Sequence, residues 1–136
     1  MTLQATAPGA QAWAQMVPAP PPGALPYERG PHDTAVLGCV SAMTDALRPT
    51  YGSLAFERWI LPGGATWPEV AAHYQAQLRP GWTVDRLPER LAGCRMRSWT
   101  GSPGLRRVAM ALVDDVFAAT DPFKVVVVAK PAEGRP

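Results

Sequence analysis

The residues that could carry acid–base, nucleophilic or metal chemistry are few and scattered in this 136-residue chain. The two histidines, His32 and His73, are far apart, and neither belongs to an HxH or HExxH metal-binding motif. The sequence contains no GxSxG nucleophile motif and no phosphate-binding loop. We therefore predict no catalytic residue, no metal site and no cofactor, and we expect a protein that is not an enzyme.

Arginine and tryptophan recur at alternate positions of one segment. Residues 94–100 read CRMRSWT and are followed by the turn sequence GSPG and by a second β-like segment. If Cys94, Met96 and Ser98 face the core together with Val108, Met110 and Leu112, the opposite face carries Arg95, Arg97, Trp99 and Arg107. Guanidinium and aromatic groups together suit carboxylates, phosphates or stacked bases, so we predict a partner-binding surface here. Arginine on an exposed strand is also ordinary surface chemistry.

Three functions remain open on these residues. The first hypothesis is a non-enzymatic interaction or accessory domain that binds a protein or anionic partner through the Arg/Trp surface. The second is a single-stranded nucleic-acid binder, although a net charge of +2 is small for neutralising many phosphates. The third is a small-ligand cavity between helix and sheet, although its aromatic residues are more typical of a core. That cavity would be lined by Trp59, Trp67, Tyr74 and Trp82.

The clearest predicted element is a helix that begins after Thr66. Thr66 and Glu69 have the spacing of a capping box, and Pro68 suits the first helical turn. The positions that recur on one helical face are Trp67, Val70, Ala71, Tyr74 and Leu78. Pro80-Gly81 ends the helix, and His73 is expected on its exposed side.

The rest of the chain from residue 34 reads mostly as β-strands. Strands are predicted at 34–43, 54–61, 82–87, 94–100, 105–113 and 123–128, and connections at 45–52, 88–93 and 114–122. Ala and Met within 34–43 would also suit a helix, and 88–93 could form a helical turn. The four valines 125–128 lack polar alternation, so this strand is expected to be central or covered on both faces. The order predicts an α+β fold, with one main helix packed on a mostly antiparallel sheet of five or six strands.

A proline-rich leader is predicted at residues 1–31, ahead of a single α+β domain at 32–136. The run Pro20-Pro21-Pro22 favours extended polyproline II structure. This composition suits a solvated arm, a ligand for a partner's groove, or an arm that covers its own domain. Trp13 favours a docked arm, because a solvated tryptophan is unusual.

The stretch TWPEVAAHYQAQLRPGW, residues 66–82, resembles a pattern found in small bacterial proteins and lipoproteins of largely unknown function. The matching positions are Thr66, Val70, Tyr74, Leu78, Gly81 and Trp82. The resemblance implies a bacterial protein with a β-α-β-β-β plan, in which the matched residues serve capping and packing. It implies no activity.

The two cysteines, Cys39 and Cys94, lie far apart and lack metal-ligand spacing, so we expect two small buried thiols rather than a disulfide. No secretory signal is visible, and no apolar run approaches the roughly 20 residues of a membrane-spanning helix. We therefore expect a cytoplasmic protein without a membrane span, most simply one with a protein partner. The sequence predicts neither the identity of that partner nor the oligomeric state.

Overall fold

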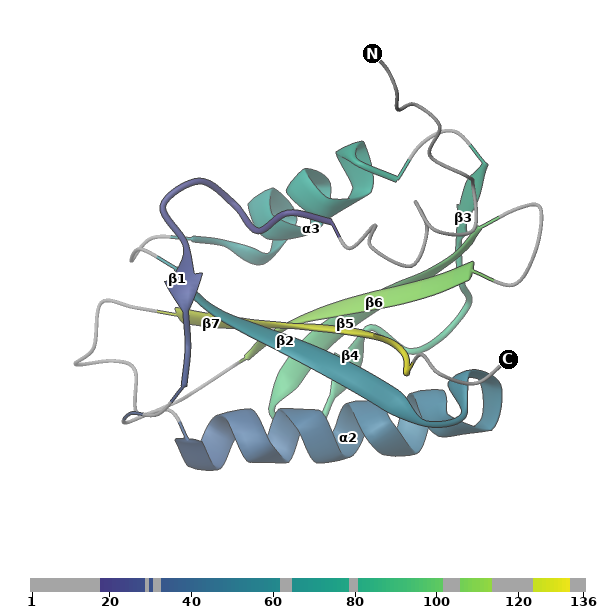
Figure 1. Cartoon of the computed structure of the whole chain (residues 1–136), viewed down its shortest axis with the longest axis horizontal. Coiled ribbons are helices and arrows are strands. Elements are labelled where there is room, and N and C mark those ends of the chain that lie inside the picture. Colours follow the sequence, from purple (N-terminus) through teal and green to yellow (C-terminus); the bar gives the residue numbers. More distant parts are fainter. Residues whose placement is uncertain are drawn as a thin grey trace, which may run out of the picture.

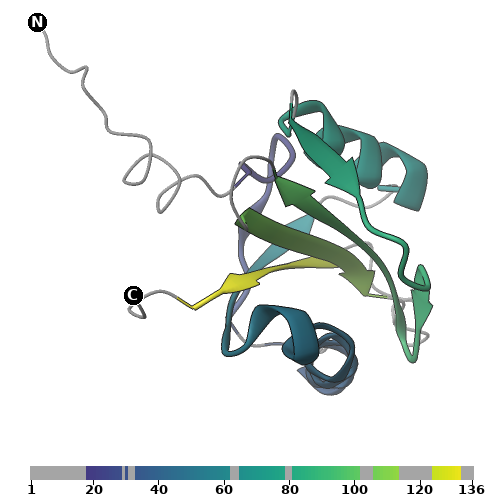
Figure 2. The ribbon, with the colours of Figure 1, turned by 90° about the vertical axis from the view of Figure 1, so that its right-hand side faces the viewer.

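The computed structural model describes residues 18–28, 30, 33–61, 65–78, 81–101, 106–113 and 124–132. These residues form three layers, in which helices α2 (Asp33–Tyr51) and α3 (Trp67–Ala76) cover opposite faces of one sheet (Figures 1 and 2). The α+β class with an antiparallel sheet is confirmed. The described chain has two helices rather than one and seven strands rather than five or six.

The order of strands places the end of the chain in the middle of the sheet. The order is β1 (Leu25–Pro26), β2 (Leu54–Leu61), β7 (Lys124–Pro131), β6 (Arg106–Val113), β5 (Cys94–Gly101) and β3 (Trp82–Val84), and β4 (Arg90–Leu91) also pairs with β5. All pairs among the described strands are antiparallel. Val125 and Val127 pack in the core under α2, while Val126 and Val128 pack in the core under α3. The central, doubly covered strand predicted for the four valines is thus confirmed.

Helix α2 occupies the segment where a strand at 34–43 and a connection at 45–52 were expected, and both predictions are wrong. Its buried residues recur every three or four positions, at Val36, Cys39, Met43, Leu47 and Tyr51. That period belongs to one helical face and is visible only over the whole helix. Gly38 lies on the exposed side of this helix, with nothing within 4 Å of an added Cβ. No helix of the described residues is long and apolar enough to cross a membrane.

Helix α3 begins as predicted. The Thr66 hydroxyl accepts the Glu69 N–H at 3.4 Å, and the Glu69 carboxylate accepts the Thr66 N–H at 3.3 Å. This completes the capping box and satisfies two amide donors at the helix start. The buried residues Trp67, Val70, Ala71 and Tyr74 match the predicted apolar face.

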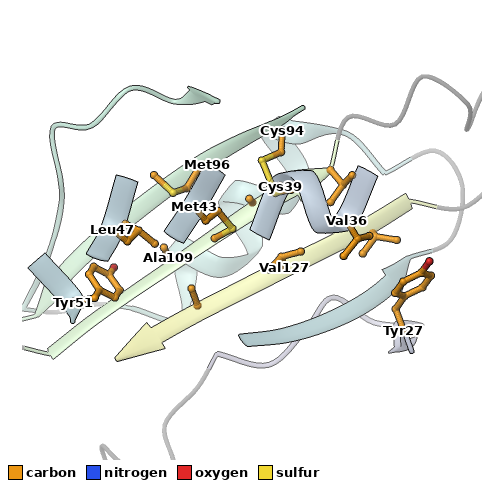
Figure 3. Close-up of a cluster of buried hydrophobic side chains, with 14 residues drawn as sticks. Tyr27, Val36, Cys39, Met43, Leu47, Tyr51, Cys94, Met96, Ala109 and Val127 are labelled. Carbon is orange, nitrogen blue, oxygen red and sulfur yellow. A yellow bond between two sulfur atoms is a disulfide. The ribbon is translucent and has the colours of Figure 1, made fainter. Parts of the chain in front are cut away.

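A disulfide joins the two cysteines, so the prediction of two free thiols is wrong. Cys39 lies on the buried face of α2, directly over Cys94 at the start of β5, and their Cα atoms are 5.7 Å apart. This contact exists because residues 34–43 form a helix across the sheet. Around the disulfide, Met43 and Leu47 pack against the α2 face of the sheet (Figure 3).

Part of the predicted leader lies on the domain. The chain runs from Pro18 beside α3 to β1, where Leu25 lies opposite Ile60 of β2 (Figure 1). Tyr27 is 7% exposed, and its hydroxyl donates to Asp33 at 2.6 Å. Residues 1–17, including Trp13, and His32 lie outside the described residues.

Candidate anion-binding groove

The four residues predicted to form one Arg/Trp surface lie on two different faces. In the register of β5 and β6, Thr100 rather than Trp99 lies opposite Arg107. Because alternate residues of a strand point to opposite faces, Arg95 and Arg97 share the α3 side with Trp99, and Arg107 lies on the α2 side. The predicted pairing is therefore wrong by one residue, and Trp99 is only 2% exposed.

The wrong register has a physical cause. All six residues of β6 from Val108 to Val113 are buried, since α2 covers one face of the strand and α3 the other. A strand that is buried on both sides has no alternation of polar and apolar residues, so its hydrophobic pattern does not select a register. The pattern alone therefore left the face of Trp99 undetermined.

The aromatic residues expected to line a ligand cavity do not surround a common space. Tyr74 and Trp67 belong to the core under α3. Trp59 on β2 and Trp82 on β3 are separated by strands β7, β6 and β5. Trp82 lies against Gly101, where an added Cβ would be 3.0 Å from the indole. We therefore assign Trp59, Tyr74 and Trp82 to packing, whereas Trp67 also borders a groove beside α3.

A groove lies beside α3 on its flank toward β5, with a cavity volume of about 530 Å³. Its lining residues are Trp67, Pro68, Ala71, Ala72, Gln75, Ala76 and Arg97. The helical members recur at every fourth position, so the groove follows α3 for about 12 Å. The three alanines leave space beside the helix that larger side chains would fill.

Arg97 forms the β5 side of this groove and is held from two directions. Its guanidinium carbon lies 5.6 Å from the centroid of the Trp67 ring, which is within cation–π range. Its Nε donates to Oε2 of Glu89 at 3.0 Å, and its Nη2 donates to the same oxygen. The Arg97 side chain is 26% exposed and the Glu89 side chain 47% exposed, so both remain accessible from solvent.

Two further arginines extend the positive charge along the same side of the sheet. The pairing of β4 with β5 places Arg90 directly opposite Arg95, and Arg95 is two residues from Arg97. Within the described chain Arg97 has Glu89 as an ion-pair partner, whereas Arg90 and Arg95 form no ion pair. Like charges directly opposite each other destabilise a sheet, and a bound anion would relieve that repulsion.

Sequence reasoning missed Glu89 and Arg90, because residues 88–93 were interpreted as a loop or helical turn. They belong instead to a hairpin in which Leu91 lies opposite Cys94 and Ala92-Gly93 forms the turn. Gly93 has φ +84°, a conformation that favours glycine in two-residue hairpin turns. The single glycine between two short alternating segments was the signal that could have revealed the hairpin.

Asp85 anchors the segment that leads to this hairpin. Its carboxylate accepts hydrogen bonds from the Ser98 hydroxyl at 2.8 Å and from the Thr100 hydroxyl at 2.7 Å. Arg107 donates to the Thr100 hydroxyl at 3.3 Å, so Arg107 belongs to this cluster and not to the groove. The network ties residue 85 to β5 and thereby restricts where Glu89 and Arg90 can lie.

The side chains of Tyr51 and Tyr74 are buried phenols that are poorly suited to acid–base chemistry. The hydroxyls of Tyr51 and Tyr74 have no hydrogen-bond partner. Burial raises the pKa of both tyrosines well above the ordinary value, with smaller contributions from Asp85 near Tyr51 and from Glu57 near Tyr74. Both phenols therefore stay protonated at neutral pH and are unsuited to act as bases.

The opposite flank of α3 already holds an extended segment. The Ala19 N–H donates to Oε1 of Gln77 at 2.8 Å, and Nε2 of Gln77 donates to the Ala19 carbonyl at 3.0 Å. Nε2 of His73 lies 2.9 Å from the same carbonyl, so His73 contacts the leader. Ala19 has the only backbone N–H between Pro18 and Pro22, because the other four residues are prolines. Thus the leader covers the β2 side of α3, and the groove lies on its β5 side.

Comparison with protein families, with curated proteins and with solved structures finds no match for this chain. The resemblance of residues 66–82 to small bacterial domains stays a prediction.

Proposed function

We propose that this domain is a non-enzymatic binding module whose groove between α3 and β5 holds an extended acidic segment of a partner protein. The observation that carries the proposal is the row of Arg90, Arg95 and Arg97 beside the groove, two of them without an ion pair to a described residue. Guanidinium groups bind carboxylates through directional, charge-assisted hydrogen bonds. A groove of about 12 Å accommodates about four residues of an extended chain.

Single-stranded nucleic acid suits this surface less well. Binding of that kind uses aromatic faces on which bases can stack. Arg97 lies over the ring of Trp67 and Arg106 lies 5.3 Å from the centroid of the Trp82 ring, so these faces are already occupied by guanidinium groups. The third candidate, Trp99, is buried.

A pair of charge variants tests the proposal. Arg90→Gln/Arg95→Gln removes two positive charges beside the groove and leaves Arg97 and its contact with Trp67 in place. Arg48→Gln/Arg58→Gln is the matched control, because both arginines are exposed and lie outside the groove. The probe is a fluorescently labelled peptide of alternating Glu and Pro, and anisotropy is measured at low and at physiological salt.

We expect the groove variant to bind the acidic peptide about tenfold more weakly than the parent, and the control to bind it like the parent. A labelled oligothymidine is titrated in parallel. Tighter binding of the oligonucleotide would favour the nucleic-acid hypothesis. Absence of peptide binding in the parent at low salt would contradict the proposal.

The disulfide favours an oxidising compartment rather than the cytoplasm that the sequence suggested. Disulfides persist in oxidising compartments and are rare in the cytoplasm. Cys39 and Cys94 are fully buried, so soluble reductants reach the bond only when the α2 face opens. We therefore propose that the domain works in an oxidising compartment.

Alkylation of the native protein, followed by reduction and a second label, should find both thiols protected. Two free thiols in protein from its native cell would favour the cytoplasm.

A further inference from the structure

We infer that Glu89 is a displaceable internal ligand of Arg97, and that the groove takes partner segments with carboxylates at alternate positions. This inference rests on the proposed function. It begins from the contact itself, in which two nitrogens of Arg97 donate to one oxygen of Glu89. That contact uses Arg97 donors that an incoming carboxylate would need. A partner therefore has to exchange places with Glu89 before it can pair fully with Arg97.

Exchange requires only the Glu89 side chain to move. The Glu89 backbone is held where it is, because its carbonyl accepts the Met96 N–H at 2.6 Å and Asp85 anchors the preceding segment to β5. The side chain is 47% exposed, so the released carboxylate enters water with little change in hydration. Arg97 can meanwhile keep its place against the Trp67 ring.

The tether between Glu89 and the domain makes it an effective competitor. A carboxylate on the same short hairpin is present at a high effective concentration, so a ligand with a single carboxylate displaces it poorly. A ligand that also pairs with Arg95 gains a second contact, for which the described chain supplies no competing ion pair. Glu89 therefore lowers the affinity of every ligand that pairs with Arg97, whereas a ligand that pairs with Arg95 alone leaves Glu89 in place.

The spacing of the arginines sets the spacing of the ligand. Arg95 and Arg97 lie two residues apart on one face of β5, which corresponds to about 7 Å along the strand. In an extended peptide, side chains two residues apart also point to the same side with that separation. Carboxylates at alternate positions therefore match the two guanidinium groups, whereas adjacent carboxylates point to opposite sides.

The test uses two labelled peptides of identical composition, one alternating Glu and Thr and one repeating Glu-Glu-Thr-Thr, in which no two Glu residues lie two positions apart. Three proteins are titrated by anisotropy: the parent, Glu89→Gln, and Asp45→Asn. Asp45 is exposed on α2, so its replacement removes the same charge from the far side of the sheet. Gln at position 89 keeps the backbone contact to Met96, so the fold is retained.

We expect the parent to prefer the alternating peptide at least fivefold. Glu89→Gln should bind the alternating peptide at least threefold more tightly than Asp45→Asn does, and should bind the other peptide more tightly by a smaller factor, because that peptide can pair with Arg95 alone. In the Arg97→Gln background the Glu89→Gln change should lose its effect.

Two results would overturn the inference without touching the proposed function. These are parent binding with no preference between the peptides, and equal affinities of Glu89→Gln and Asp45→Asn. If no variant binds either peptide, the proposed function itself fails, and the inference fails with it.

Discussion

The two faces of the sheet are closed in different ways. On one face a helix of 19 residues spans the strands and is joined to β5 by the disulfide. On the other face a helix of 10 residues covers the centre, the leader lies along one flank, and the groove remains along the other. Both faces bury a continuous apolar core. The difference shows that an accessible groove arises where a cover is too short for its sheet, without loss of the core beneath it.

The largest expected effect tests how much α3 contributes to the stability of the domain. Tyr74→Ala should lower the free energy of unfolding by about 3–5 kcal/mol, because the ring is 1% exposed in the core under α3. His73→Ala, one residue along, should cost much less, since His73 contacts the leader, Gln77 and the Tyr74 ring at the surface of the helix. Urea unfolding monitored by circular dichroism measures both. A loss below 1 kcal/mol for Tyr74→Ala would mean that α3 contributes little to stability.

The next effect concerns the covalent link of the α2 face. Replacing both Cys39 and Cys94 by Ala should lower the free energy of unfolding by about 2–4 kcal/mol, because the closed loop no longer restricts the unfolded chain. The control is the parent protein unfolded with and without reductant, which should show a loss of similar size. Equal midpoints for all samples would indicate that α2 is held by packing alone.

A third change probes the outer edge of the α3 face. Gly101→Ala should destabilise the protein by about 1–3 kcal/mol, because the added methyl group would lie 3.0 Å from the Trp82 indole. The change should also loosen β3, whose Trp82 pairs with Gly101. Hydrogen exchange of the β3 amides measures that loosening. Unchanged exchange would show that Trp82 shifts without cost.

Alkaline pH compares one buried phenol from each face. The pKa values of Tyr51 and Tyr74 are raised in the folded protein, so above pH 10 the unfolded chain releases these protons first. Each tyrosine should therefore lower the free energy of unfolding by up to about 1.4 kcal/mol per pH unit in that range. The stabilisation is complete below pH 10 and is lost as the pH rises. Tyr51→Phe and Tyr74→Phe should each flatten the decline, which urea midpoints between pH 9 and 11 would reveal.

The smallest expected effect is a gain in stability. Gly38 lies on the exposed side of α2, and an added Cβ would meet nothing within 4 Å. Gly38→Ala should therefore raise the free energy of unfolding by about 0.5–1 kcal/mol, through the higher helix propensity of alanine. Thermal unfolding measures the shift. A loss of stability would imply that this side of α2 is packed against something in solution.

The contrast between the two helices also shows what could be predicted from the sequence. Helix α3 can be predicted from a short segment, because Thr66, Pro68 and Glu69 mark its start within four residues. Helix α2 has only Asp33 in its first turn as a start signal, and residues 34–43, seven of which are apolar, fit a strand as well as a helix when taken alone. Only the full series from Val36 to Tyr51 reveals its period.

The site was predictable in part, for related reasons. Arg95 and Arg97 were correctly predicted to share a face, because residues two apart on a strand lie on the same side whatever the pairing register. Arg107 was predicted on the wrong face and Trp99 at the surface. The reason is that β6 is buried on both faces, so its hydrophobic pattern does not select a pairing register with β5. Glu89 precedes and Arg90 begins β4, a strand of only two residues, which is too short for a periodic pattern to reveal.

The position of β7 has a consequence for how the molecule is made. Strands β2 and β6 both pair with β7, which follows them in the chain, so neither has that neighbour until residues 124–131 have left the ribosome. Until then a nascent chain presents two bare strand edges, and such edges readily join other chains. The arriving strand itself carries four valines between Lys124 and Lys130, and flanking charges of this kind discourage self-association. Completion of the sheet is thus a late, single insertion event, and chaperone protection would matter most just before it.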